Sequence, residues 1–342
     1  YGAYGYTARL LLPKLKALGI DVVVAGRNAE KTDQVGSELG MPSRVFSLDD
    51  GAAVDDALKD ATAVLNAAGP YTHTTTAIGD GCLRNGAHYL DLSGEVGSLG
   101  QAAEAGAAAK ELGLMILPAI GFDVVPSDCL AAHVARRVPG ATHLTLYVAA
   151  SNLISRGSSV TLADHIGIPV HTRRNGRLEP MQLRMQLRWV DFGSGHRPAV
   201  AVSWGDLVTA YHSTGIPNIE VYFEATPFRF AAVTMNQYWG WLLRSSGANA
   251  WLRQWADMLP AGPSEQERAR ERCAIVVEAA SDRHSARARI ETPEAYQFTA
   301  DAAVRVIEQV RAGRREAGFQ TPSTLFGPDF VMELDGVTRA DL

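Results

Sequence analysis

The residues with the clearest chemical meaning stand at the start of the chain, in a glycine turn formed by residues 2–7. Glycine at positions 2 and 5 lets the backbone turn tightly and lie against a pyrophosphate, whose charge then sits on the N–H groups of a helix start. The spacing Gly-x-x-Gly-x-x-Ala, completed by Ala8, also marks ordinary tight turns, so a dinucleotide site needs support from residues further along the chain. The residues expected at the pyrophosphate are Gly2, Ala3, Tyr4, Gly5, Tyr6 and Thr7.

The second informative position comes after the apolar stretch 21–26, which predicts a buried strand. A site for NAD usually has an acidic residue about 20 residues after the glycine turn, where it accepts the ribose hydroxyls. Here Arg27 and Asn28 end the strand, and Lys31 stands one turn into the next predicted helix. The two basic side chains suit a 2′-phosphate and predict NADP(H) as cofactor. The alternative is that Arg27 only caps a strand at the surface.

A third group comes after the strand predicted at 63–67. Small residues and a chain reversal stand at its carboxyl end, and this is the edge at which open α/β sheets bind ligands. We therefore expect the cofactor's ribose and nicotinamide to lie near Ala67, Ala68, Gly69, Pro70 and Tyr71. Tyr71 is either a proton donor or a wall of the site.

Three carboxylates are predicted at the same edge. Asp91 and Glu95 lie at the carboxyl end of the strand that begins at His88. They are candidates for substrate binding or for acid/base chemistry, and the alternative is that they only cap the next helix. Asp123 lies in a glycine turn after the buried strand that begins at Leu114. It either acts in catalysis or bonds only to nearby backbone.

The second half of the chain offers scattered candidates. Arg156 precedes a hydroxyl-rich helix start that could hold an anion or an acyl carbonyl, or be only a good cap. Tyr211 and His212 could protonate a carbanion after hydride addition, and Trp204 is a candidate for substrate binding. The basic cluster around the turn at 171–180 is an exposed hairpin or a patch for an acidic carrier protein. The aromatic segment 228–255 is a dimer interface or core, an acyl pocket, or a membrane-surface contact.

The elements that position these residues alternate between helix and strand. Helices are expected at 7–18, 29–39, 51–59, 75–85 and 102–112, with strands at 21–26, 44–48, 63–67, from 88 and from 114. Short links in such an alternation imply an α/β fold whose parallel sheet is covered on both faces. A central strand should precede the glycines, yet only Tyr1 stands before them, so we expect the given chain to lack roughly 5–10 residues at its N-terminus.

Composition sets outer limits on function. The chain has 342 residues, enough for two domains, with 46% hydrophobic and 20% charged residues. Its net charge of −5 gives no positive field for nucleic acid. Three distant cysteines argue against a disulfide framework, no histidine spacing suits a metal, and no apolar run of about 18 residues predicts a membrane span. A cytoplasmic protein that acts on small molecules is expected.

Several motifs together make the chain resemble a known family. GAYGYTA, VVVAGRN, VLNAAGPY, HYLDLSGE and LPAIGFDVVPSDCLA are similar to the NADP-binding domain of the saccharopine dehydrogenase-like family. Within it, the chain most resembles short bacterial members, a group that includes trans-acting enoyl reductases of lipid and polyketide synthesis. The similarity continues through WGDLVTAYHSTGIPNIEVYF, GPSEQERARERC and GFQTPSTLFGPDFV. Tyr4 departs from the small Ser or Thr that is usual in the first motif.

The resemblance implies a domain plan and a function. It implies a Rossmann-type doubly wound parallel sheet at 1–127, an inserted mixed α/β (α+β) domain at 128–293 and a return to the first domain at 294–342. It also implies a homodimer and an NADPH-dependent oxidoreductase that reduces an activated double bond in an enoyl-type acyl or polyketide intermediate, free or carrier-bound. The alternatives are a saccharopine-type amino-acid imine reductase and a catalytically inactive NADP-binding scaffold or regulator.

Overall fold

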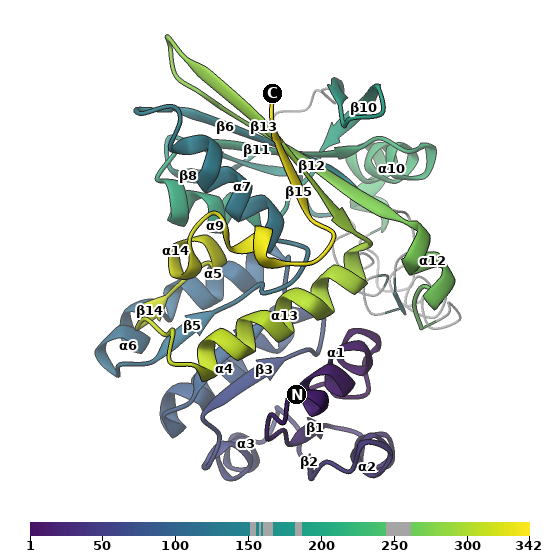
Figure 1. Ribbon diagram of the computed structural model, residues 1–342, viewed down its shortest axis with the longest axis vertical. Coiled ribbons are helices and arrows are strands. Elements are labelled where there is room, and N and C mark those ends of the chain that lie inside the picture. Colours follow the sequence, from purple (N-terminus) through teal and green to yellow (C-terminus); the bar gives the residue numbers. More distant parts are fainter. Residues whose placement is uncertain (151–154, 157–158, 160–166, 182–186, 244–260) are drawn as a thin grey trace. The chain divides into compact units, whose positions relative to one another are not determined.

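The computed structural model describes residues 1–150, 155–156, 159, 167–181, 187–243 and 261–342 (Figure 1). The chain forms two compact units. Unit 1 contains Tyr1–Val125 and Tyr296–Phe326, and unit 2 contains Pro126–Ala295 and Gly327–Leu342.

Unit 1 alternates short strands with helices along the chain, as the sequence predicts. Its elements are α1 (Tyr6–Ala17), β1 (Val24–Gly26), α2 (Ala29–Leu39), β2 (Ser43–Val45), α3 (Gly51–Leu58), β3 (Ala63–Asn66), η1 (Tyr71–His73), α4 (Thr75–Asn85), β4 (His88–Asp91), α5 (Val96–Glu104), α6 (Gly106–Glu111), β5 (Met115–Leu117), α13 (Ala295–Arg311), β14 (Gly318–Phe319) and α14 (Pro322–Phe326).

The strands of unit 1 are all parallel. They form a two-stranded sheet, β1-β2, and a four-stranded sheet in the order β14-β5-β4-β3. The first residues of the chain touch both sheets: the amino group of Tyr1 donates to Leu65 O at 2.7 Å, and the amide of Gly2 donates to Ala25 O at 2.8 Å. The Rossmann-type parallel α/β fold is confirmed, while a strand before Tyr1 stays a prediction.

One helix differs from its predicted form. The alanine-rich stretch expected as a single helix at 102–112 is two helices, α5 and α6, which meet at Ala105 and Gly106. A Cβ at Gly106 would lie 2.7 Å from the Cβ of Phe319 in β14. The break therefore brings a residue without a side chain to the place where β14 packs against α6.

Unit 2 is built on a mixed sheet. Its elements are α7 (Val125–Ala135), β6 (His143–Ala149), β7 (His171–Arg174), β8 (Arg177–Pro180), β9 (Leu187–Asp191), β10 (His196–Ala201), α9 (Asp206–Thr214), β11 (Asn218–Glu224), α10 (Pro227–Leu243), α12 (Glu265–Arg270), β12 (Arg272–Ala280), β13 (Ser285–Pro293), η2 (Phe330–Glu333) and β15 (Thr338–Asp341).

The sheet of unit 2 has nine strands, in the order β15-β13-β12-β6-β11-β10-β9 with the β7-β8 hairpin joined to β11. Among the strands that the structure describes in this unit, β6 and β11 are the one parallel pair, so the sheet is mixed, as expected for the second domain. The C-terminal segment corrects the predicted return of 294–342 to the first domain. Tyr296–Phe326 belongs to unit 1, but Gly327–Leu342 belongs to unit 2, because β15 pairs with β13 there.

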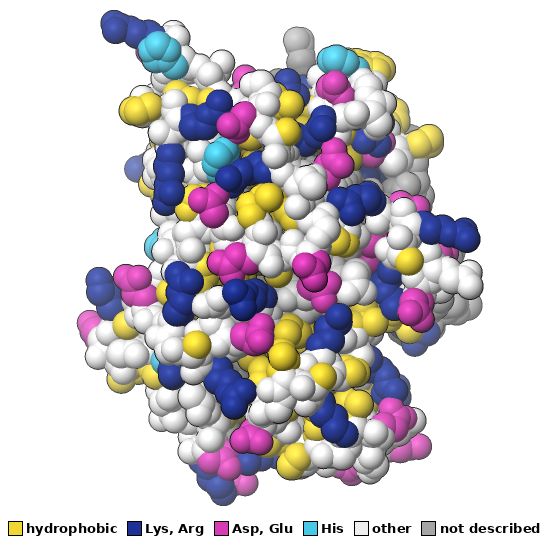
Figure 2. Space-filling view, in the orientation of Figure 1, with side chains coloured by type: hydrophobic (Ala, Val, Ile, Leu, Met, Phe, Trp, Pro, Cys, Tyr) yellow, Lys and Arg dark blue, Asp and Glu magenta, His cyan; other side chains and the backbone are white. Residues whose placement is uncertain are grey.

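The surface agrees with the composition. On the face drawn in Figure 2, basic and acidic side chains are interspersed rather than gathered by sign. Cys82, Cys129 and Cys273 are buried, and none of them forms a disulfide. Within the described ranges, no helix has the length and apolar character needed to cross a membrane.

Candidate active site

The glycine turn packs against the loop after β3. Gly2 has φ 87°, in the left-handed region, and its amide and that of Ala3 both donate to Ala25 O. A Cβ at Gly2 would lie 2.9 Å from the carbonyl carbon and oxygen of Ala67. The turn closes through the amide of Gly5, which donates to Gly2 O at 2.9 Å. Both the backbone conformation and the close approach therefore require glycine at position 2.

Helix α1 begins at this turn, and the described structure shows backbone amides at its start that have no hydrogen-bond acceptor. Gly5 is the N-cap of α1, no side chain caps the helix, and the first turn has no acidic residue. In the part of the chain that the structure describes, the amides of Tyr4 and Thr7 have no hydrogen-bond acceptor. Free amides at the positive end of a helix dipole bind anions. The start of α1 thus fits the pyrophosphate of a dinucleotide.

Basic side chains stand at the carboxyl end of β1. Arg27 and Lys31 are exposed, and the Lys31 ammonium lies 5.9 Å from the centre of the Tyr4 ring. That ring lies over Gly26, where a Cβ would come within 2.7 Å of Tyr4 Cε1. Asn28 has a local role as the N-cap of α2, because its Oδ1 accepts the amide of Lys31 at 2.9 Å. Two cations and an aromatic ring therefore border the turn where a 2′-phosphate is expected.

The loop after β3 is fixed by side chains that the sequence did not single out. Asn66 Nδ2 donates to Thr74 Oγ1 at 2.9 Å, and Asn66 Oδ1 accepts the amide of Ala68 at 3.1 Å. Thr74 Oγ1 in turn donates to Ala68 O at 2.8 Å. The sequence signal that could have predicted this loop is an asparagine at the end of a strand followed by a threonine at the start of the next helix. The bonds hold residues 67–71 at the edge of the sheet.

Glu95 holds the next part of this loop. Its Oε1 accepts the amide of Tyr71 at 2.9 Å, and its Oε2 accepts the amide of Thr72 at 3.0 Å. The carboxylate is buried, and both oxygens face the start of η1. This geometry favours a positioning role; direct binding of substrate by Glu95 stays a prediction.

Asp91 is a buried centre of hydrogen bonds. Its Oδ1 accepts the amides of Ser93 and Ala119, at 2.9 and 2.7 Å, and its Oδ2 accepts the hydroxyl of Tyr89 at 2.8 Å. Ala119 has φ 58°, an unusual value for a residue with a side chain, so Asp91 secures a strained turn after β5. Burial raises the pKa of Asp91, although these donors oppose the rise. The contacts favour the structural alternative for this residue.

Asp123 has the features of a proton-transfer group. Burial raises the pKa of its carboxyl to about 7, and the negative charge of Glu95 adds to the rise. The carboxyl lies against the backbone of the 91–95 turn, since a Cβ at Gly94 would be 2.6 Å from Asp123 Oδ2. We call Asp91, Glu95 and Asp123 the acid cluster. The sequence predicted all three residues, and the structure brings them together.

Tyr71 belongs to the same neighbourhood. Burial raises the pKa of its hydroxyl well above the usual value, and Asp91, Asp123, Glu95 and Tyr296 raise it further. Such a phenol stays protonated at neutral pH. It can donate a hydrogen bond, but it does not release its proton readily.

Helix α13 completes the site from far along the chain. Thr299 Oγ1 accepts the amide of Phe122 at 3.0 Å, and a Cβ at Gly121 would lie 2.7 Å from Thr299 Cγ2. The Tyr296 ring meets the Tyr6 ring edge to face, with centres 5.2 Å apart. Tyr296 thus links the start of α1 to the surroundings of Tyr71. No local pattern assigns Tyr296 to this site, because the residues around it do not show which turn their helix meets.

The remaining predicted residues lie in unit 2. Tyr211 is 37% exposed and stacks on Arg173, with the guanidinium carbon 4.1 Å from the ring centre, while His212 is exposed beside it on α9. Trp204 packs on Phe223 at 4.7 Å between ring centres. Arg156 is exposed, and its amide donates to Ala261 O. Catalytic and substrate-binding roles for these four residues stay predictions.

Two further expectations concern residues that the structure describes only in part. Of the helix start at 155–161, residues 157–158 and 160–161 lie outside the described residues. Of the aromatic segment 228–255, the backbone is described to residue 243, as α10, and residues 244–255 lie outside.

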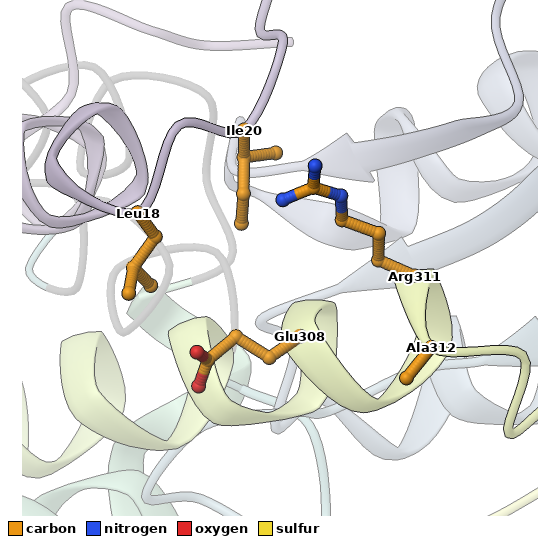
Figure 3. Close-up of a pocket in the computed structure, with 5 residues that line it drawn as sticks. All are labelled: Leu18, Ile20, Glu308, Arg311 and Ala312. Atoms are coloured by element: carbon orange, nitrogen blue, oxygen red, sulfur yellow. The ribbon is translucent and has the colours of Figure 1, made fainter.

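A separate pocket in unit 1 is not part of this site. It has a volume of about 320 Å³ and is lined by Leu18, Ile20, Glu308, Arg311 and Ala312 (Figure 3). Leu18 is the C-cap of α1, and a helix of 12 residues is about 18 Å long. The pocket therefore lies at the opposite end of α1 from the glycine turn.

Among the described residues, no group of three or more His, Cys, Asp or Glu side chains is arranged to hold a metal.

The first part of the chain is similar to a known domain family. Residues 1–116 match the family model of the saccharopine dehydrogenase NADP binding domain. This part of the chain is thus similar to the saccharopine dehydrogenase NADP binding domain. The similarity accords with the open start of α1, and the matched family model implies a nicotinamide cofactor.

Curated relatives match over less than half of the chain. The human saccharopine dehydrogenase-like oxidoreductase is 28% identical over 160 residues, which cover 41% of this chain and 37% of the relative. The trans-acting enoyl reductase of Mycobacterium leprae (strain TN) is 33% identical over 147 residues, covering 40% and 35%. A lipid droplet localized protein of Caenorhabditis elegans is 28% identical over 142 residues, covering 37% and 33%. The matches thus span about a third of each relative's length.

A solved structure extends the similarity of fold beyond the NADP binding domain. The saccharopine dehydrogenase (L-Glu forming) of Saccharomyces cerevisiae has a TM-score of 0.63 and 13% identity, and it covers 99% of this chain and 98% of its own. At that identity the match shows the fold alone. It agrees with a parallel α/β unit together with a mixed-sheet unit.

Proposed function

We propose that the chain is an NADPH-dependent oxidoreductase that reduces an activated double bond by hydride transfer. One observation carries the proposal: a single unit combines an open helix start beside two basic side chains with a carboxyl whose pKa is about 7. A group with this pKa can give or take a proton near neutral pH, which a reduction requires.

The residues at the glycine turn would hold the cofactor. The amides of Tyr4 and Thr7 would donate to the pyrophosphate, and Arg27 and Lys31 would pair with a 2′-phosphate. Residues 67–71 would border the ribose and nicotinamide, because Asn66 and Glu95 fix that loop at the carboxyl edge of the sheet. When bound, the nicotinamide supplies the hydride, and the protein supplies orientation and the proton.

The acid cluster would manage the proton. Asp123 is partly protonated at neutral pH, and its carboxyl is held against Gly94. Tyr71 keeps its proton and can orient a carbonyl or imine by donating a hydrogen bond. Glu95 places the Tyr71 backbone through two amides and, by its charge, favours the protonated form of Asp123. In this assignment Asp123 is the acid and Glu95 is a positioning residue.

The substrate class rests on the relatives. The enoyl reductases of mycobacteria, named for that activity, support an enoyl-type acyl or polyketide intermediate, free or bound to a carrier protein. The fold shared with a saccharopine dehydrogenase supports the second candidate, an amino-acid imine. We further propose a homodimer in the cytoplasm, which size-exclusion chromatography with light scattering and fractionation of cells would test.

Steady-state NADPH oxidation with matched enoyl thioesters, ketones and imines tests the proposal. Turnover of enoyl thioesters, lost in Asp123→Asn while NADPH affinity is kept, is the expected result. Turnover of imines alone would favour the second candidate. Tight NADPH binding without turnover of any substrate would indicate a scaffold or regulator, and failure to bind NADPH would overturn the proposal.

A further inference from the structure

Unit 2 contains a cavity of about 380 Å³ beside the hairpin turn at 171–180, and the proposed reaction gives this cavity no role. It is bordered by the first residues of β6 and β11, by the turn of the β7-β8 hairpin and by β9. Its ionic side chains are Arg173, Arg174, Arg188 and Glu220. These four side chains carry three positive charges and one negative charge.

Arg173 puts a buried positive charge in the wall. The residue is 8% exposed, its Nε donates to Leu207 O at 2.5 Å, and its Nη1 donates to Gly176 O at 2.6 Å. The Tyr211 ring covers the guanidinium. Within the described residues, no carboxylate pairs with Arg173. Burying a positive charge without a counter-charge costs free energy. The Arg173 guanidinium therefore favours binding of an anion in the cavity.

Arg174 and Arg188 share the one carboxylate. Glu220 lies 2.6 Å from Arg188 Nη2 and 3.8 Å from Arg174 Nη2. The Arg188 guanidinium also stacks on the Tyr222 ring, 4.6 Å from its centre, which fixes its plane. Glu220 can neutralise only one guanidinium, so two positive charges remain available to a ligand.

The hairpin turn that carries Arg174 is tied to the sheet. The amide of Asn175 donates to Asn218 Oδ1 at 3.0 Å, and the amide of Gly176 donates to Pro217 O at 2.9 Å. Asn175 has φ 48° and Gly176 has φ 77°, so two left-handed residues set the turn. In the described part of the chain the Asn175 side chain makes no hydrogen bond. An amide donor is thus presented beside the arginines on a fixed turn.

We propose that this cavity binds the phosphate group of a small molecule. Guanidinium groups match the geometry and charge of phosphate oxygens, and arginine is the usual residue for them. The surplus of two positive charges disfavours a cation, and the charged lining disfavours a purely apolar ligand. All of the lining residues belong to unit 2, so the site is separate from the glycine turn.

Isothermal titration of the full chain with inorganic phosphate, pyrophosphate and glycerol 3-phosphate tests this site. Arg174→Glu reverses a half-exposed charge at the cavity, whereas Arg177→Glu makes the same change on the exposed strand β8 of the same hairpin, outside the lining. Loss of a charge-assisted bond predicts that Arg174→Glu weakens phosphate affinity by about tenfold or more. Arg177→Glu should change it by about twofold or less, through screened long-range charge alone.

The outcomes separate the possible sources of the phosphate. Tighter binding of glycerol 3-phosphate would assign the site to a phosphate monoester, and tighter binding of inorganic phosphate or pyrophosphate would assign it to the free anion. Asn175→Gly, which removes the amide but suits the left-handed backbone, should also weaken binding while leaving thermal unfolding unchanged. Equal effects of Arg174→Glu and Arg177→Glu, or no binding at millimolar phosphate, would overturn the proposal.

Discussion

Within the described part of the chain, the glycine turn has backbone amides without an acceptor at Tyr4 and Thr7, whereas the acid cluster has most of its carboxylate oxygens engaged. At the start of α1, the amides of Tyr4 and Thr7 and the exposed side chains of Arg27 and Lys31 are available to a ligand. In the acid cluster, Asp91 and Glu95 are buried and accept hydrogen bonds at every carboxylate oxygen. The glycine turn thus presents donors and cations to a ligand. The acid cluster instead holds the Asp123 carboxyl in a fixed position that is poorly hydrated.

This difference separates affinity from chemistry. Substitutions of the ligand-facing cations at the glycine turn should act mainly on cofactor binding, because these groups meet the ligand directly. Substitutions in the acid cluster should act mainly on stability and on proton transfer, because its groups meet one another. Variants in the two regions therefore test whether cofactor binding can be changed separately from stability and proton transfer.

The largest effect is expected for Gly2→Val. A Cβ at this position would lie 2.9 Å from the Ala67 backbone, and the residue has φ 87°. Left-handed strain and overpacking together predict a loss of about 2–5 kcal/mol in the free energy of unfolding. NADPH binding should fall below detection, as measured by fluorescence titration and urea unfolding.

Gly19→Val is the matched control for Gly2→Val. Gly19 has φ 62°, but a Cβ there would meet nothing within 4 Å. The control carries backbone strain without the clash, at a cost of about 1–2 kcal/mol, and should keep its NADPH affinity. Equal loss of NADPH binding in both variants would show that general instability, rather than the turn, explains the effect.

The second prediction concerns the pH dependence of stability. An unfolded aspartate has a pKa near 3.9, and the folded pKa of Asp123 is about 7. Because the folded value is the higher one, the stability gained from the protonated form is complete below pH 4 and is lost as pH rises to about 7. Between pH 5 and 8, the native chain should lose about 2–3 kcal/mol relative to Asp123→Asn.

Urea unfolding at the two pH values, combined with an NMR titration of the Asp123 carboxyl, measures this difference. Asp21→Asn, at an exposed site, should leave the pH dependence as it is in the native chain. If the native chain and Asp123→Asn show parallel pH profiles, the carboxyl titrates normally and the division between the two regions fails.

The same contrast explains how much the sequence could predict. Gly2, Arg27 and the strand ends were recognisable because each lies in a local pattern whose meaning depends on a few neighbouring residues. The gathering of the acid cluster also came from the topology, since parallel strands end at one edge. The contacts of Tyr296 and Thr299 with that edge could not be predicted, because they join residues more than 170 positions apart. The pKa of Asp123 depends on burial, which no local spacing reveals.

Arg27→Ala tests the phosphate preference of the glycine turn. Loss of a charge-assisted bond to a 2′-phosphate predicts about 10- to 150-fold weaker NADPH binding, equivalent to about 1.5–3 kcal/mol. NADH lacks this phosphate, so its affinity should barely change. Competition titrations of the two cofactors measure the ratio, with Lys59→Ala, at an exposed ion pair on the surface, as the control. An unchanged preference would remove Arg27 from the site.

The smallest effect is expected for Asn28→Ala, which asks whether a residue beside the glycine turn serves the fold or the ligand. Asn28 Oδ1 accepts the amide of Lys31 at 2.9 Å as the N-cap of α2. Loss of an N-cap predicts a decrease of about 1 kcal/mol in the free energy of unfolding, with NADPH affinity nearly unchanged. Asn28→Ser can restore the cap without the amide group, so it should recover stability. The contrary outcome is that Asn28→Ser recovers stability and still binds NADPH more weakly than the native chain, as weakly as Asn28→Ala. In that case the Asn28 side-chain amide contacts the cofactor, and Asn28 both caps α2 and binds the ligand.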